Sequence, residues 1–425
     1  MSGVPSVPVP PSSAGDPTSS ASASASPGTA ATAPAPAAKP RDASGLPALG
    51  VMGGGQLGRM FVHAAQAMGL RVAVLDPDLH SPAGAAAQAH VQAAYLDAQG
   101  LAALAAQCDA VSTEFENVPA QALEQLARHC RVAPGAHAVR ICQDRAREKA
   151  HFEASGVPCA PWASIASEAD LDAVPAGLLP GLLKTAQLGY DGKGQQPVPD
   201  AAALREAWAR LGRVPCVLEQ RLALRHEISV IVARGDDGTV VHLPVQQNLH
   251  RDGILAVTQV PAPDVDAATA ARAVDCASRL AAGMDYVGVL CVEFFVLDDG
   301  SLRANEMAPR PHNSGHPSID ACDVSQFELQ VRTLAGLPLV PPRLHSPAVM
   351  LNLLGDLWRE QADGTRTPPD WSAVLALPGV HLHLYGKLEA RPGRKMGHLT
   401  VTGPTLAQAR EVALQAAAAI GFAPF

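Results

Sequence analysis

Two glutamates on a predicted hairpin have the types and spacing to bind a metal ion. Residues 291–308, "CVEFFVLDDGSLRANEMA", read as two strands joined by a turn at 298–301. If the turn is centred between its two middle residues, Glu293 lies directly opposite Glu306. Facing carboxylates repel each other, so we expect a cation between them. Mg²⁺ fits two carboxylates, the amide of Asn305 and the phosphates of a substrate. The alternative is a bulged hairpin, one residue out of this register, in which one glutamate is simply solvated.

A second stretch, "LLKTAQLGYDGKGQ", places a lysine before a glycine-rich loop. Lys184 closes a β-like run, and the loop that follows contains Gly189, Gly192 and Gly194. Glycines let backbone amides approach a ligand closely, and a lysine beside such a loop suits nucleotide phosphates, with the loop as a lid. No G-K-[ST] opens a helix, so this is not a Walker A sequence. A plain hairpin turn at residues 191–192 is the alternative.

The stretch "VMGGGQLGRM" raises a different possibility, a dinucleotide site. Its three glycines, Gly53, Gly55 and Gly58, match G-x-G-x-x-G, and Asp76 ends the next apolar run. This spacing is compatible with a nicotinamide or flavin dinucleotide. The alternative is a close-approach turn over a sheet, where Gln56 and Leu57 meet another ligand. A nucleotide site built from Lys184 and the acid pair would make a second one redundant, which favours the alternative.

Two polar stretches near the C-terminus are candidate substrate contacts. In "APRPHNSGHPS", His312 and His316 have the spacing of zinc ligands on a helix, but the prolines and glycine around them argue against a helix. We therefore expect a substrate-binding loop, or a surface loop. In "YGKLEARPGRKMGHL", four basic residues predict a phosphate or carboxylate clamp, or else a solvated basic turn. They are Lys387, Arg391, Arg394 and Lys395.

Composition limits the class of protein. The chain has 425 residues, 48% of them apolar, and a net charge of −8 with no large basic cluster, so we expect two or three domains and no nucleic-acid partner. The eight cysteines form no C-x-x-C pair, and no apolar run approaches a membrane span. Ala, Ser and Pro make up 28 of the first 40 residues, which predicts a disordered tail at 1–45. A cytoplasmic enzyme is expected.

The elements that must position these residues fall into three folded domains. At 46–140, strands alternate with helices, which predicts an α/β domain with a Rossmann-like parallel sheet and its ligand at the carboxyl ends of the strands. We expect one helical stretch at 135–156. Between 141 and 340, β-rich runs and two long helices indicate an α+β domain. A small C-terminal domain is predicted at 341–425.

Taken together, the order and spacing of these motifs resemble the ATP-grasp superfamily, and within it the N5-carboxyaminoimidazole ribonucleotide synthetases of purine biosynthesis. The resemblance runs from about Leu46 to the C-terminus. Besides the stretches quoted above, it is carried by "TEFENVP", "VLEQ", "HEISVIVAR" and "QNLHRDGIL". It implies an ATP-grasp fold preceded by a pre-ATP-grasp domain, and a homodimer. It also implies carboxylation of 5-aminoimidazole ribonucleotide with ATP, bicarbonate and Mg²⁺, which Mn²⁺ could replace.

The resemblance also assigns residues to ligands. For the nucleotide it implies Arg145, Lys184, Gly189, Tyr190, Asp191, Gly192, Lys193, Gly194, Gln195, Glu219, Gln220, Arg221, Leu222, Glu227, His250, Asn305 and Glu306. For Mg²⁺ it implies Glu293, Glu306 and Asn305. For the ribonucleotide it implies Gln56, Leu57, Glu114, Asn313, Lys387, Arg394 and Lys395. Lys184, Arg310, Tyr190 and Asp191 are the expected catalytic residues, with Arg310 holding carboxyphosphate.

Two other classes of enzyme remain as alternatives. A dehydrogenase would explain the first glycine loop but neither the acid pair nor the second loop. Another ATP-grasp ligase, such as a formate-dependent glycinamide ribonucleotide transformylase or a biotin carboxylase, would explain those features but not "QNLHRDGIL" or "RPGRKMGHL".

Overall fold

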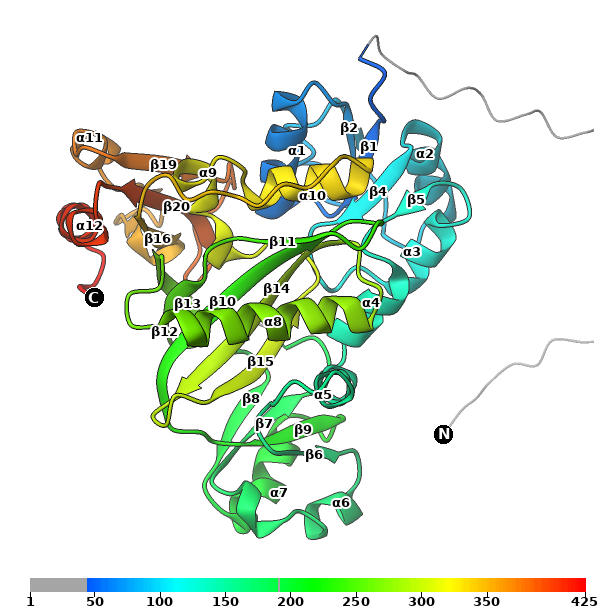
Figure 1. The fold of residues 1–425 in the computed structure, drawn as a ribbon, viewed down its shortest axis with the longest axis vertical. Helices are drawn as coiled ribbons and strands as arrows, with labels where there is room; N and C mark the ends of the chain where they lie inside the picture. The colour runs from blue at the N-terminus through cyan, green and yellow to red at the C-terminus, as the bar shows by residue number, and fades with distance from the viewer. Residues whose placement is uncertain (1–43, 190–191) are drawn as a thin grey trace, which may run out of the picture. The chain divides into compact units, whose positions relative to one another are not determined.

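The computed structural model describes residues 44–189 and 192–425, so most of the predicted tail lies outside the described residues. The N-terminal part is a parallel sheet with strand order β3-β2-β1-β4-β5 (Figure 1). Its strands are β1 (Leu49–Met52), β2 (Val72–Leu75), β3 (Ala89–Val91), β4 (Ala110–Thr113) and β5 (Arg131–Val132). The helices that follow them are α1 (Gln56–Ala67), α2 (Ala98–Gln107) and α3 (Ala120–Leu126). Residues after β1 and β4 therefore meet at one edge of the sheet, as predicted.

The helical stretch expected at 135–156 is two helices, α4 (Ala136–Cys142) and α5 (Arg145–Ala154). Asp144 separates them, because its side chain accepts hydrogen bonds from the backbone N–H groups of Ala146 and Arg147, each at 3.1 Å. An aspartate N-cap satisfies the free amides of a helix start. The stretch is helical as expected, but the break at Asp144 was not predicted from the sequence. As a consequence, Arg145 stands in the first turn of a new helix.

The next part is a four-stranded antiparallel sheet with order β6-β9-β7-β8. Its strands are β6 (Trp162–Ile165), β7 (Gly181–Thr185), β8 (Gln195–Val198) and β9 (Cys216–Gln220). Helices α6 (Glu168–Asp172) and α7 (Ala201–Arg210) accompany them, and Trp208 of α7 packs with Leu183 and Leu218 in one buried cluster. Lys184 thus lies on a central strand of this sheet.

A nine-stranded antiparallel sheet forms the largest part of the fold. Its order is β15-β14-β10-β12-β13-β16-β20-β19, with β11 paired to β10. The strands are β10 (Leu224–Arg234), β11 (Val240–His242), β12 (Gln246–Arg251), β13 (Ile254–Val260), β14 (Gly288–Leu297), β15 (Leu302–Ala308), β16 (Ala348–Leu354), β19 (Val380–Leu384) and β20 (Lys395–Thr402). This sheet continues past residue 340, where we expected a separate domain, because β13 pairs with β16.

Helices cover both faces of this sheet. Successive side chains of β10 point to opposite faces, so neighbouring residues pack against different helices. Val230 packs in the cluster that includes α8 (Ala267–Gly283), whereas Ile231 packs in the cluster that includes residues near α10 (Gln326–Ala335). Helix α10 also packs on α1, so it joins the large sheet to the N-terminal part (Figure 1). The remaining elements are α9 (Ser318–Ala321), β17 (Arg359–Glu360), β18 (Arg366–Thr367), α11 (Trp371–Leu375) and α12 (Leu406–Ile420). No helix in the described ranges has the length and apolar character needed to cross a membrane.

Candidate active site

The acid-bearing hairpin forms, but its register differs from the predicted one near the turn. Phe294 pairs with Ala304, whereas Val292 pairs with Met307. The extra residue between these pairs is a β-bulge in β15, where two residues oppose one on the partner strand. Glu293 therefore faces the bulge that contains Asn305 and Glu306, instead of pairing directly with Glu306. The turn is one residue longer than the prediction assumed. The bulge compensates for that residue, so the pairs beyond it, such as Val292 with Met307, have the predicted register.

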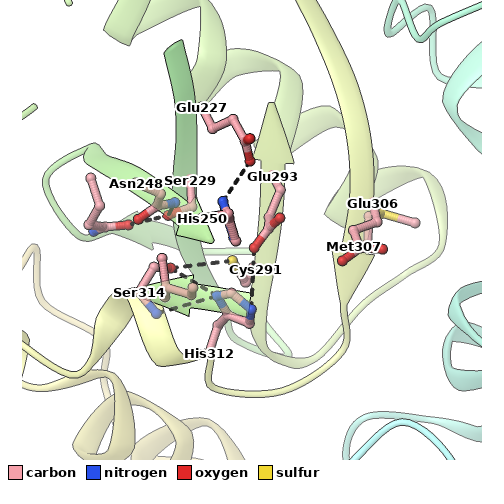
Figure 2. Close-up of polar contacts among 12 residues, drawn as sticks. Glu227, Ser229, Asn248, His250, Cys291, Glu293, Glu306, Met307, His312 and Ser314 are labelled. Atoms are coloured by element: carbon pink, nitrogen blue, oxygen red, sulfur yellow. Dashed lines mark hydrogen bonds and ion pairs between the residues drawn. The ribbon is translucent and has the colours of Figure 1, made fainter. Parts of the chain in front are cut away.

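The two glutamates have different surroundings, which Figure 2 shows in part. Glu293 is buried, with Oε1 3.3 Å from Nε2 of His312. Burial and the charge of Glu306 raise the pKa of Glu293 above its usual value. Burial acts to raise the pKa of Glu306 too, but the charges of Arg145 and Lys184 outweigh it and hold this pKa below its usual value. The pair therefore repels, as expected, and Glu306 takes the charge.

The chemistry of this donor set fits a hard divalent cation. Oδ1 of Asn305 is buried and has no hydrogen-bond partner among the described residues. An unpaired buried carbonyl oxygen costs free energy, and it lies on the strand that carries Glu306. Across the described ranges, no group of three or more His, Cys, Asp or Glu side chains could hold a metal by itself. A cation at Glu293 and Glu306 would need further oxygen ligands, such as the phosphates of a nucleotide.

A cavity of about 420 Å³ lies beside this acid pair. Its size suits a small-molecule ligand. Ten residues expected at ligands line it: Gln56, Leu57, Glu114, Arg145, Gly189, Glu293, Glu306, Arg310, Asn313 and Lys395. They come from the N-terminal sheet, the large sheet and the C-terminal strands, so the cavity brings together segments far apart in sequence. Glu116, Gln143, Glu148 and His312 also line it, and we did not assign the first three of these from the sequence.

Charge in this cavity is unevenly balanced. Five carboxylates line it, those of Glu114, Glu116, Glu148, Glu293 and Glu306. Three permanent cations line it, those of Arg145, Arg310 and Lys395. Burial raises the pKa of Glu148 to about 8, although Lys149 and Arg145 oppose that shift, so this carboxyl is largely neutral at pH 7. An anionic substrate would still need additional positive charge.

Lys184 belongs to a buried ion triad outside the lining of this cavity. Its Nζ lies 3.1 Å from Oε2 of Glu219, and Nζ of Lys149 lies 3.3 Å from the same oxygen. Lys149 also donates to the backbone oxygen of Asn305 at 2.9 Å. This fully buried lysine thus ties the end of β9 to the acid-bearing strand. The sequence offered one signal for it, a charged residue on the apolar side of a short helix, and we missed it.

The second glycine loop folds back onto the end of β7, next to Lys184. The N–H of Thr185 donates to the oxygen of Gly194 at 2.9 Å. Gly192 and Gly194 have φ of 75° and 72°, values that favour glycine. Among the expected contacts, Gln195 begins β8, Gln220 ends β9, and Arg221 and Leu222 follow β9. None of these four residues lines the 420 Å³ cavity, and Lys193 does not line it either. Tyr190 and Asp191, expected to be catalytic, lie outside the described residues.

Glu227 and His250 form an ion pair on neighbouring strands of the large sheet (Figure 2). Oε2 of Glu227 lies 2.7 Å from Nδ1 of His250. Burial opposes protonation, but the hydrogen bond to Glu227 and the nearby acids raise the pKa of His250 to about 8. Both residues lie near Glu293 without lining the cavity, so these two expected nucleotide contacts are next to one of the two acids of the hairpin.

The N–H groups of the first glycine loop are already bound by the carboxyl group of Glu114. Its oxygens accept hydrogen bonds from the N–H groups of Gly55 at 2.6 Å and Gly58 at 2.8 Å. Asp76 is likewise engaged, by the N–H of Gly54 at 2.7 Å and the hydroxyl of Tyr95 at 2.6 Å. A dinucleotide needs these amides for its pyrophosphate. The geometry therefore favours the alternative to a dinucleotide site.

The basic stretch forms a turn in which three of the four basic residues bind other residues of the same stretch. Arg394 donates from Nη1 to the backbone oxygen of Glu389 at 2.9 Å, and Arg391 pairs with the carboxylate of Glu389. Lys387 donates to the backbone oxygen of Lys395 at 2.7 Å. Only Lys395, at the start of β20, lines the cavity. Of the expected ribonucleotide contacts, Lys387 and Arg394 are thus beside the cavity lining and not in it.

Family models match three successive segments of the chain. A ribonucleotide synthetase preATP-grasp domain matches residues 46–143, and an ATP-grasp domain matches residues 150–327. A phosphoribosylaminoimidazole carboxylase C-terminal domain matches residues 348–412. The exact domain boundaries that we expected remain predictions.

Named relatives agree with these matches over most of the chain. The N5-carboxyaminoimidazole ribonucleotide synthase of Brucella melitensis biotype 1 is 44% identical, covering 84% of this chain and 96% of its own. The Bacillus subtilis enzyme of the same name is 39% identical, covering 83% and 90%. A solved Aspergillus clavatus N5-carboxyaminoimidazole synthase in complex with ADP and 5-aminoimidazole ribonucleotide superposes with a TM-score of 0.80 at 32% identity, covering 88% and 99%. With its acid-bearing hairpin, its ATP-grasp sheets and these relatives, the chain belongs to the N5-carboxyaminoimidazole ribonucleotide synthase family of ATP-grasp ligases.

Proposed function

We propose that this protein carboxylates 5-aminoimidazole ribonucleotide with bicarbonate, hydrolysing ATP to ADP and phosphate and giving N5-carboxyaminoimidazole ribonucleotide. One observation carries the proposal beyond family membership. The metal acids Glu293 and Glu306, the expected ribonucleotide contacts Gln56 and Glu114, and Lys395 all line one cavity. A phosphorylated intermediate made at the acids could therefore reach a ribonucleotide without crossing bulk water.

The reaction is difficult because bicarbonate is a poor electrophile. An oxygen of bicarbonate attacks the γ-phosphorus of ATP, the bond from that phosphorus to the β,γ-bridging oxygen breaks, and ADP leaves. The product, carboxyphosphate, has phosphate as its leaving group. In the direct route, the aminoimidazole amine forms a bond to the carbonyl carbon of carboxyphosphate, phosphate departs and the amine loses a proton. In the other route, carboxyphosphate first splits into CO₂ and phosphate, and the amine then adds to CO₂ and loses a proton. Excluding water protects the intermediate.

The cations of the site would act on the phosphoryl group. Arg145 lines the cavity and remains charged, and Lys184 lies at the end of β7 close to Gly194 of the glycine loop. We propose that both bind ATP phosphates, with the glycine loop over them and Tyr190 and Asp191 within that loop. Neutralising charge as it spreads over the phosphoryl oxygens lowers the barrier. Lys184 is paired with Glu219, and its ammonium group has three N–H donors, so it can keep this pair while it binds a phosphate oxygen.

We further propose that Glu293, Glu306 and Asn305 hold Mg²⁺, which Mn²⁺ can replace. When bound, the ion neutralises charge on the phosphates and orients them. The excess of carboxylates in the cavity and the unpaired Asn305 oxygen support this assignment. Glu227 and His250 stand beside these acids and are proposed to contact the nucleotide, with residues 219–222 at the adenine.

For the ribonucleotide we propose contacts from both sides of the cavity. Gln56, Leu57 and Glu114 come from the N-terminal sheet, and Asn313 and Lys395 come from the large sheet and its neighbouring loop. Lys387 and Arg394 are proposed to reach its phosphate. Arg310 would hold bicarbonate and then carboxyphosphate. We also propose that the protein is cytoplasmic and forms a homodimer. Light scattering of the purified protein tests the homodimer.

The decisive experiment is a substrate-omission assay. With Mg²⁺, ATP, bicarbonate and 5-aminoimidazole ribonucleotide together, ADP and phosphate should form in step with an acid-labile carboxylated ribonucleotide. Formate with glycinamide ribonucleotide should give no product. Turnover with that second pair, and none with the first, would reassign the protein to a transformylase.

A further inference from the structure

Arg310 is held by an acid from the opposite side of the cavity. Its Nε lies 2.5 Å from Oε2 of Glu116, a residue that follows β4 of the N-terminal sheet. Nη1 donates to the backbone oxygen of Pro311 at 3.0 Å. Nη2 makes no hydrogen bond to another described residue, which leaves one edge of the guanidinium for a ligand. Both Arg310 and Glu116 line the cavity.

The segment carrying Glu116 is itself fixed. Nε2 of Gln143 donates to the backbone oxygens of Glu116 at 2.5 Å and Val118 at 2.7 Å. Burial would raise the pKa of Glu116, but the charge of Arg310 and the hydrogen bond to it hold this pKa below its usual value. Glu116 therefore stays ionised and is a weak proton acceptor, which argues against its acting as a general base.

Competition within the cavity explains why such a partner is needed. Glu114, Glu293 and Glu306 line the same cavity, and each could draw an unrestrained guanidinium toward itself. Arginine presents a planar fork whose hydrogen bonds have fixed directions. The contact between Nε of Arg310 and Glu116 fixes the plane of the guanidinium group and keeps this group away from Glu293 and Glu306.

Resting on the function proposed above, we propose that Glu116 is the positioning residue for Arg310, so that the N-terminal sheet sets the geometry of the bicarbonate and carboxyphosphate subsite. Glu116 touches neither reactant in this account. It acts through the arginine and links the sheet that contacts the ribonucleotide to the group that holds the carbon to be transferred.

The test is steady-state kinetics of Glu116→Gln, Glu116→Asp and a matched control, Glu124→Gln. Glu124 is an exposed acid on α3 that pairs with Arg140 on the surface. Loss of a charged hydrogen bond predicts a rise in the bicarbonate KM on the order of 10- to 100-fold in Glu116→Gln. The KM of ATP should stay within about twofold, since Glu116 does not meet the nucleotide. Glu116→Asp should recover part of the loss, and Glu124→Gln should behave as wild type.

A double-mutant cycle separates positioning from a general structural role. If Glu116 acts through Arg310, adding Glu116→Gln to Arg310→Lys should change the bicarbonate KM little further. An unchanged bicarbonate KM in Glu116→Gln, or fully additive losses in the double variant, would overturn the inference. Failure of the proposed function looks different, because the wild-type protein would then give no bicarbonate-dependent product at all.

Discussion

Replacing Gly55 by alanine tests whether the first glycine loop binds Glu114. A Cβ built at Gly55 lies 2.4 Å from Oε1 of Glu114, too close for any real contact, so the carboxylate must move. Moving it breaks the hydrogen bonds from the N–H groups of Gly55 and Gly58. Each broken hydrogen bond leaves buried polar groups unpaired, at a cost of about 1–3 kcal/mol. The expected loss of stability is therefore about 3 kcal/mol or more.

Gly135→Ala is the matched control for that variant. Gly135 is also the N-cap of a helix with negative φ, and a Cβ there meets nothing within 4 Å. Both variants share the cost of alanine at an N-cap, about 0.5–1 kcal/mol. An unfolding entropy of about 2.1 cal/mol/K per residue gives a chain of this length a Tm shift of about 1 °C per kcal/mol, so Gly55→Ala should lower the Tm by about 4 °C and Gly135→Ala by about 1 °C or less.

Kinetics give the functional part of the same test. Glu114 lines the cavity and is a proposed ribonucleotide contact, so Gly55→Ala should raise the ribonucleotide KM at least about tenfold and leave the ATP KM nearly unchanged. The effect on the ribonucleotide runs through Glu114, because a Cβ at Gly55 meets the carboxyl group of this residue. Equal Tm values for the two alanine variants, with an unchanged ribonucleotide KM, would refute the reasoning.

Three further predictions concern other buried charges. Glu293→Gln and Glu306→Gln should each lower turnover at least about 100-fold, because each removes a proposed metal ligand, and normal activity at limiting Mg²⁺ would contradict this. Burial holds the pKa values of His316 and His398 well below 6.5. The folded state keeps both neutral while the unfolded chain protonates, so stability should fall below about pH 6.5, by up to about 1.4 kcal/mol per pH unit for each histidine. Unfolding experiments between pH 5.5 and 7.5 should show that His398→Gln reduces the slope of stability against pH by up to about 1.4 kcal/mol per pH unit. Lys149→Met should cost about 3 kcal/mol in denaturant unfolding, because it removes one partner of a buried ion pair, and an unchanged midpoint would contradict that role.

The sequence predicted most of the fold because its local signals agree with one another. Alternating strands and helices near the N-terminus predicted a parallel sheet, and the sheet forms with that connectivity. The hairpin was predicted with its two acids near each other. Its register was wrong near the turn, because periodicity does not report whether a turn has two or three residues, and a single residue moves each side chain to the other face.

The parts of the site that escaped prediction depend on long-range contacts. Glu116 pairs with Arg310, which is 194 residues away, and Lys149 pairs with Glu219, which is 70 residues away. Neither the sequence around Glu116 nor the sequence around Lys149 contains a local pattern that identifies the partner residue. The break at Asp144 was readable in principle, since an aspartate preceding a helix start is an N-cap signal. Continuous helical propensity on both sides concealed it.

The pairing of β13 with β16 has a consequence for dividing this protein into smaller pieces. A truncation before residue 348 would leave β13 as an edge strand, still paired with β12 but with open N–H and C=O groups on the side that β16 now covers. Val257, buried in the full chain, would lose its cover. Long apolar edges recruit strands from other molecules. Such a fragment should aggregate on expression, so the C-terminal strands act as a solubility cap for the ATP-grasp part as well as supplying Lys395.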